Sequence, residues 1–147
     1  MSTSPPDRHR AHEAMRRPDV ASRLRAEEVV WLTTVDEQGR PQSSPVWFHW
    51  DGTDLLVLSE PAARKVVNIT ADPHVAVHLE GADAGALVVT LEGRAVVSAV
   101  DANRLAAYGR KYRSGFARLD TDQAAYLERF STSIVIHPTR ARAFPST

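Results

Sequence analysis

The sequence predicts a mainly β protein, built as an antiparallel barrel or sandwich with a few peripheral helices. Strand-like segments rich in β-branched and aromatic residues recur at short, regular intervals. Hairpin turns join the first three of these segments, which favours antiparallel pairing. The chain also lacks the G-x-G-x-x-G and P-loop patterns of nucleotide-binding parallel sheets.

The first half of the chain reads as a short helix followed by a meander of strands. The run Val29–Val35 is β-branched and aromatic, and Gly39 and Gly52 occupy turn positions after two successive strands. In the second strand Val46, Phe48 and Trp50 alternate with Trp47 and His49. We expect a helix from Pro18, strands over residues 29–35, 41–50 and 55–58, and turns at 36–40 and 51–54.

The second half mixes helices with longer extended runs. Asp72-Pro73 ends a helix, because the residue before proline avoids helical geometry. Glu92-Gly93 predicts a bend within an extended run, and Asp120 or Thr121 predicts a helix cap. We expect helices over 64–70, 101–112 and 121–130, a loop over 81–85, and strands over 74–79, 86–91, 93–100 and 133–137, the last with an extension over 139–144.

Length and composition restrict the classes of protein. The 147 residues are most simply one domain, and the balance of 18 basic and 18 acidic residues gives no case for nucleic acid. The absence of cysteine excludes disulfides and thiolate chemistry. Residues 1–17 lack the apolar core of a secretory signal, and no apolar run is long enough for a membrane. We expect a cytoplasmic protein with a disordered tail over 1–17 and one domain over 18–147.

A candidate anion site lies where a strand passes into a helix. Only two lysines occur against sixteen arginines, and Lys65 stands at this passage beside Arg64 and behind Ser59. A hydroxyl, two cations and the free amides of a first helical turn suit a phosphate. A solvated basic helix start is the competing interpretation.

Several segments, in their order and spacing, resemble one known family. They are Trp31–Val35, Gly39–Pro41, Ser44–Phe48, Trp50–Gly52, Lys65–Ile69, Asp72-Pro73, Leu91–Ala95 and Ile136–Phe144. Together they resemble the pyridoxamine 5′-phosphate oxidase-like split β-barrel family, and within it the actinobacterial branch of F420-dependent oxidoreductases. This resemblance implies a six-stranded antiparallel Greek-key split barrel that forms a homodimer. It also implies a cofactor groove between the two subunits.

The resemblance also implies which residues bind the cofactor. The family's phosphate-binding lysine falls on Lys65 and its strand-end serine on Ser59. The arginine that often stands two residues before the lysine is replaced here by Ala63, with Arg64 next to it. The family's strand along the tricyclic ring corresponds to the segment at Ser44. The expected cofactor-binding set is Ser44, Pro45, Val46, Trp47, Ser59, Arg64, Lys65 and Asn68.

Trp47 and a basic stretch later in the chain each have two competing interpretations. Val46 and Trp47 point to opposite faces of a strand, so core or dimer packing also explains Trp47. Residues 102–119 contain no acid and five cations, which could contact the poly-glutamate tail of F420, whereas FMN ends at its phosphate. A solvated helix face explains the same cations, which are Arg104, Arg110, Lys111, Arg113 and Arg118.

The sequence names neither a metal site nor a catalytic acid. His74 and His78 lie in a strand-like run, which would place them about 13 Å apart. His49 and His137 have no carboxylate partner that the sequence identifies, so we expect surface or interface roles for both.

The resulting functional prediction is hydride transfer from reduced F420 to a small organic acceptor. An FMN-dependent oxidoreductase on the same fold and a non-catalytic flavin or deazaflavin carrier are the alternatives. The large aromatic surface of Trp31, Trp47 and Trp50 adds to the expectation of a homodimer.

Overall fold

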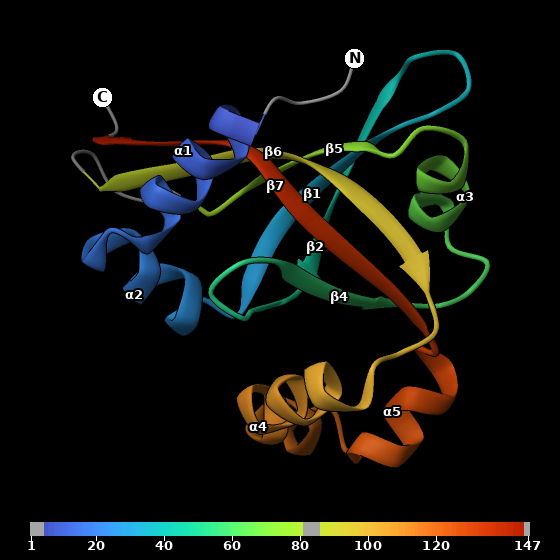
Figure 1. Ribbon diagram of the computed structural model, residues 1–147. Helices are drawn as coiled ribbons and strands as arrows, with labels where there is room; N and C mark the ends of the chain where they lie inside the picture. The colour runs from blue at the N-terminus through green and yellow to red at the C-terminus, as the bar shows by residue number, and fades with distance from the viewer. Residues whose placement is uncertain (1–4, 81–85, 146–147) are drawn as a thin grey trace.

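One antiparallel sheet, curled on itself, forms the body of the molecule in the computed structural model, which describes residues 5–80 and 86–145 (Figure 1). The strands are β1 (Val29–Val35), β2 (Pro41–Trp47), β3 (His49–Trp50), β4 (Leu55–Ser59), β5 (His74–His78), β6 (Leu87–Ser98) and β7 (Thr132–Pro145). The helices are α1 (Pro5–Arg16), α2 (Pro18–Ala26), α3 (Arg64–Ala71), α4 (Ala102–Arg118) and α5 (Gln123–Arg129). The mainly β, antiparallel architecture expected from the sequence is confirmed, whereas the loop expected over 81–85 lies outside the described residues.

The described part of the chain forms seven strands rather than six, in the order β2-β1-β5-β6-β7-β4-β3. The single strand expected over 41–50 is two strands, because Phe48 bonds to side chains of α4. Its N–H donates to the Tyr112 hydroxyl at 2.7 Å, and its carbonyl accepts from Lys111 Nζ at 2.9 Å. The strands β2 and β3 are the two edges of the sheet, and only Phe48 separates them in the sequence. The sheet therefore curls, which brings its two edges together at this residue.

β4 is buried on both faces, which explains why its sequence is apolar throughout. Leu55 and Val57 face the main core inside the curled sheet. Leu56 and Leu58 face a second core, which is covered by α4 and α5 and contains Tyr108, Tyr112, Phe116 and Tyr126. Figure 1 shows these two helices together below the sheet. α4 runs to Arg118, six residues beyond the end expected from the sequence, and Asp122 rather than Asp120 or Thr121 caps α5.

β6 and β7 form the longest ladder of the sheet. The bend expected at Glu92-Gly93 appears as a register shift between these residues in one continuous strand. A side chain at Gly93 would bring its Cβ within 2.8 Å of the His137 carbonyl oxygen, so the close approach of the strands there needs glycine. His74 and His78 lie on β5, as expected for a strand.

The expectation of a disordered tail over residues 1–17 is wrong for the residues that the structure describes. Pro5–Arg16 form α1, which packs against β7 and places Ala11 and Met15 in the interior, each 1% exposed. The sequence signal was weak because, among the side chains of this helix whose burial is described, only these two apolar ones are buried. No helix in the described ranges is both long and apolar enough to span a bilayer.

Candidate functional site

The passage from β4 into α3 carries the expected phosphate-binding residues. β4 ends at Ser59, a turn follows in which the Ala63 N–H donates to the Glu60 carbonyl at 3.2 Å, and α3 begins at Arg64. No side chain caps this helix start, so amides of its first turn remain available to a ligand. Its first turn also contains no acid. The local backbone therefore favours an anion here.

The side chains of Lys65 and Arg64 have no hydrogen bond or ion pair with any other residue that the structure describes. Lys65 is half-buried and lines two cavities, whereas Arg64 is exposed and lines only one of them. Both side chains are therefore available to an anionic ligand.

The larger cavity, of about 570 Å³, lies between the β2 and β4 ends and the α4–α5 helices. It brings together five residues of the expected set, which are Pro45, Val46, Trp47, Ser59 and Lys65. The second cavity, of about 480 Å³, contains Ser44, Arg64 and again Lys65. Both volumes lie in the range of small-molecule sites. We call the larger one the Lys65 cavity.

Stacked aromatic rings form part of the wall of the Lys65 cavity. Trp47 stacks on Tyr112 at 4.5 Å between ring centroids and on Tyr126 at 5.5 Å, and Tyr126 stacks on Phe130 at 4.4 Å. Gly115 makes room for Trp47, since a Cβ there would lie 2.8 Å from Cη2 of the indole. Trp47 therefore packs against the second core, as one of the two interpretations expected, and it also lines the cavity.

Ser59 and Asn68 have structural partners in the protein itself. Ser59 is 2% exposed and its hydroxyl donates to the Glu60 carbonyl at 3.0 Å, so it would have to rotate to donate to a ligand. Asn68 is 3% exposed, lines neither cavity, and donates to Thr34 Oγ1 at 3.0 Å and to Gln42 Oε1 at 2.8 Å. Asn68 thus fixes α3 to β1 and β2 and positions Lys65 only indirectly.

Sequence reasoning missed the contribution of α5 and of the turn before α3. Tyr126, Arg129 and Phe130 line the Lys65 cavity, and Glu60 faces them from the turn. Their spacing of three and four residues is that of one helix face, which could have identified them. Arg129 Nε donates to Glu60 Oε1 at 2.9 Å, so an ion pair joins α5 to the β4–α3 turn.

The basic stretch of α4 is not a uniform cationic surface. Arg104 pairs with Asp51 and Asp54, and Arg118 pairs with Glu28. Lys111 points inward, with its ammonium 3.8 Å from the centre of the Phe48 ring. Only Arg110 and Arg113 are exposed without an ion pair to another described residue, and both line a cavity of about 450 Å³ beside Thr121. Thr121 also lines the Lys65 cavity, so the two cavities adjoin.

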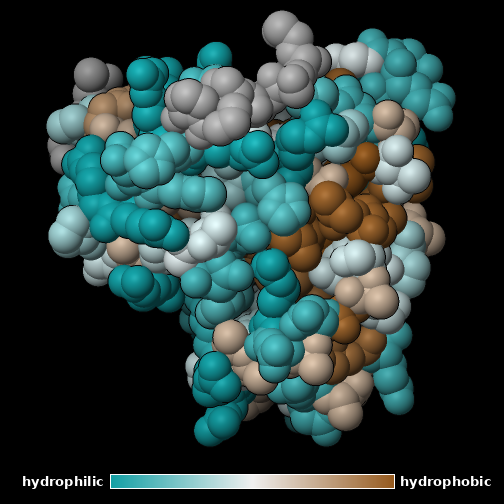
Figure 2. Space-filling view, viewed as in Figure 1, coloured by the Kyte–Doolittle hydropathy of each residue, from teal (hydrophilic) through white to brown (hydrophobic). Residues whose placement is uncertain are grey.

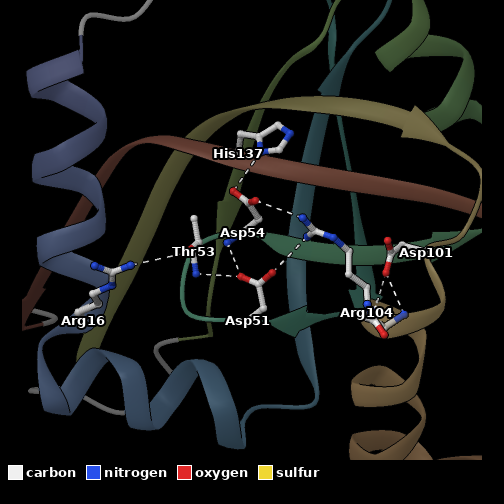
Figure 3. A network of polar contacts seen from close by, with 8 residues as sticks. Arg16, Asp51, Thr53, Asp54, Asp101, Arg104 and His137 are labelled. Atoms are coloured by element: carbon white, nitrogen blue, oxygen red, sulfur yellow. Dashed lines mark hydrogen bonds and ion pairs between the residues drawn. The ribbon is translucent and has the colours of Figure 1, made fainter.

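A polar network, drawn in Figure 3, occupies the turn between β3 and β4. His137 Nδ1 contacts Asp54 at 3.0 Å, Arg104 bonds both Asp54 and Asp51, and Arg16 donates to Thr53. The sequence identified no carboxylate partner for His137, and the structure shows that Asp54 is one. Its partner is 83 positions away in the sequence, and the network ties α1, α4 and β7 together rather than lining the Lys65 cavity.

The other histidines also have surface or packing roles. His49 is half-buried, and burial followed by the charge of Lys111 lowers its pKa. His74 bonds Asp72 at 2.7 Å, and His78 stacks on Trp31. The described residues contain no group of three or more potential ligands that could hold a metal ion.

Burial lowers the pKa of Lys111 to about 8, only partly opposed by Glu27 and Glu28. The unfolded chain, with a lysine pKa near its usual 10.5, binds more protons than the folded protein above pH 8. We therefore expect the free energy of unfolding to rise between about pH 8 and 10. It should fall at higher pH, because burial raises the pKa of Tyr108, Tyr112 and Tyr126 in the folded state.

Urea unfolding curves across this pH range would measure the effect. Lys111→Met is the control, because it keeps the aliphatic stem and removes the titrating group. A variant with the same rise between pH 8 and 10 as the wild type would show that Lys111 is not its source.

Comparison with known proteins places the chain in a family. The sequence model described as pyridoxamine 5′-phosphate oxidase matches residues 17–144. The chain belongs to the pyridoxamine 5′-phosphate oxidase family. The family resemblance and the split-barrel fold expected from the sequence are thereby confirmed. Members of this family include oxidoreductases, and the fold binds flavin-type cofactors.

Solved structures of this family are similar along most of the chain. An F420 reductase is 26% identical with a TM-score of 0.60, covering 82% of this chain and 94% of its own. A conserved hypothetical protein of Mycobacterium tuberculosis is 19% identical with a TM-score of 0.71, covering 89% and 85%. The heme storage protein HutZ of Vibrio cholerae is 20% identical with a TM-score of 0.66, covering 88% and 93%. The last two share the fold only, and a search of curated proteins gave no match.

Proposed function

We propose that this family member binds reduced coenzyme F420 in the Lys65 cavity and transfers hydride to a small organic acceptor. The observation that carries the proposal is a cavity that is lined both by aromatic rings and by a lysine at a helix start, whose side chain has no partner among the described residues. A flat apolar ring with a phosphate tail needs these two features. The likeness to an F420 reductase supports the choice of cofactor.

The roles of the chain's own residues follow from their places. Lys65, with Arg64 as a second cation, would hold the phosphate. β2 is an edge strand, so backbone groups beside Pro45 are free to meet the polar rim of the ring. Trp47 and Tyr126 would exclude water from the ring, and the bound deazaflavin would supply the hydride.

Arg110 and Arg113 give a specific reason to favour F420 over FMN. They line the cavity that adjoins the Lys65 cavity, where a longer anionic tail could follow the surface of α4. FMN would end at its phosphate and leave these arginines unused. An FMN-dependent oxidoreductase and a non-catalytic carrier remain the alternative functions on this fold.

Titration of the pure protein with F420 and with FMN tests the choice of cofactor. We expect tighter binding of F420, and we expect Arg110→Gln/Arg113→Gln to weaken F420 binding more than FMN binding. Added salt should reduce this difference, because exposed charges are screened. Equal affinity for the two cofactors in the wild type would remove the preference for F420.

Oxidation of bound reduced F420 separates an enzyme from a carrier. The absorbance of the oxidised cofactor should return after a small unsaturated or oxidised acceptor is added. Tight binding without reoxidation by any acceptor would favour the carrier.

We also propose that the protein is a cytoplasmic homodimer. Two of the three tryptophans do not supply the apolar surface that we expected, since Trp50 is 4% exposed and Trp47 packs in the second core. Val67 and Val96 supply exposed apolar surface instead, since their side chains are 50% and 49% exposed. Figure 2 shows apolar side chains gathered on the side of the molecule where α3 and the end of β6 lie.

A further inference from the structure

The Lys65 cavity contains an acid that should disfavour the ligand proposed for it. Glu60 lines this cavity together with Lys65, and its carboxylate would repel a phosphate bound there. The main chain of Glu60 is fixed, because its carbonyl accepts from both the Ala63 N–H and the Ser59 hydroxyl. Glu60 therefore cannot leave the cavity by a shift of its backbone without breaking these bonds.

Arg129 determines where the Glu60 carboxylate lies. Its Nε bonds Glu60 Oε1 at 2.9 Å, and its guanidinium lies 5.3 Å from the centre of the Phe130 ring. Arg129 stands in the last turn of α5, where the helix dipole favours a cation. The two partners come from different elements that line the cavity, the β4–α3 turn and α5, so the ion pair joins two parts of its lining.

If Arg129 were removed, the Glu60 carboxylate would be attracted to Lys65, which is a cation of the same cavity. An ion pair between these two would occupy the phosphate anchor with an internal carboxylate. From these contacts we infer that Arg129 is a positioning residue, which neutralises Glu60 and keeps it away from Lys65, and so lets the cavity accept a phosphate-bearing ligand. This inference rests on the proposed function of the cavity.

A double-mutant cycle on the pair tests the inference, with FMN as the phosphate-bearing probe and riboflavin as its phosphate-free counterpart. Arg129→Gln should weaken FMN binding about tenfold, the effect of ~1.4 kcal/mol. Glu60→Gln/Arg129→Gln should return the affinity to within about twofold of the wild type, since repulsion and competition both vanish with Glu60. Riboflavin affinity should stay the same in all four proteins.

Arg118→Gln is the matched control. Arg118 pairs with Glu28 at 2.8 Å, with side-chain exposures of 59% and 51%, compared with 72% and 46% for Arg129 and Glu60. It lies outside the Lys65 cavity, so its loss should leave FMN binding unchanged. All variants should fold, because exposed ion pairs contribute little to stability.

Three results would overturn the inference: unchanged FMN affinity in Arg129→Gln, equal losses for FMN and riboflavin, or a double variant as weak as the single one. If the wild type binds F420 but not FMN, F420 replaces FMN as the probe in the same cycle. If it binds neither cofactor, the proposed function fails, and pyrophosphate titrated into the same proteins by calorimetry then decides the inference. Loss of pyrophosphate binding in Arg129→Gln with recovery in the double variant supports it. No pyrophosphate binding, or no difference among the variants, overturns it.

Discussion

Replacement of Lys65 by alanine is expected to raise the dissociation constant of the cofactor by about ten- to a hundredfold. A hydrogen bond to a charged group contributes roughly 1.5–3 kcal/mol, and each 1.4 kcal/mol is about tenfold in affinity. Lys65 is half-buried at the uncapped start of α3 and has no partner among the described residues, so it can give its full charge to a phosphate. Calorimetric titration with F420 and FMN would measure the change.

Two further variants separate charge from shape at this position. Lys65→Met keeps the aliphatic stem and should lose nearly as much affinity as Lys65→Ala. Lys65→Arg should recover only part of the loss, because the guanidinium is planar and longer than the ammonium. The melting temperature should change little in all three. Unchanged affinity for both cofactors in the folded Lys65→Ala protein would remove the phosphate anchor and most of the proposed site.

Removal of residues 1–17 is expected to destabilise the protein by several kcal/mol. The deletion takes Ala11 and Met15 out of the interior and removes the hydrogen bond from Arg16 Nε to the Gly52 carbonyl at 3.2 Å. Met15→Ala alone should reduce the free energy of unfolding by about 2–5 kcal/mol, the usual result of truncating a large buried side chain. Chemical denaturation of the two variants would measure both effects.

Glu13→Ala is the control for the helix itself. Glu13 is exposed on the same helix, where its contact with His9 at 3.1 Å is solvated. Its replacement should change the free energy of unfolding by less than about 0.5 kcal/mol. A truncated protein with an unchanged denaturation midpoint would show that α1 contributes nothing to stability and would restore the disordered tail expected from the sequence.

Local patterns predicted the elements whose partners lie close in the sequence. β1 has the expected bounds, and alternate residues along it are buried, as its composition suggested. The break at Phe48 could not be predicted, because Tyr112 and Lys111, which bind its backbone, come from a helix more than sixty positions away. The helix α1 could not be predicted for a similar reason, because the core that contains Met15 is formed mostly by residues later in the chain.

The candidate site shows the same division. Lys65 and Ser59 were found because a strand-to-helix passage is visible in the sequence, and five of the expected residues do line one cavity. The wall made by Tyr126 and Phe130 was missed, because a short amphipathic helix does not reveal which surface it covers. Asn68 looked like a ligand-binding residue, but its amide bonds two strands of the sheet.

The junction at Phe48 has a consequence for the order of folding. Strands β2 and β3 are neighbours in the sequence, yet the bond that fixes the residue between them comes from Tyr112, 64 positions later. Closing so long a loop costs chain entropy, and this cost arises before the contact can stabilise the folded chain. We therefore expect the barrel to close late, when α4 docks. Tyr112 of α4 also stacks on Trp47, which lines the Lys65 cavity, so an intermediate with an open barrel would lack this support for the cavity.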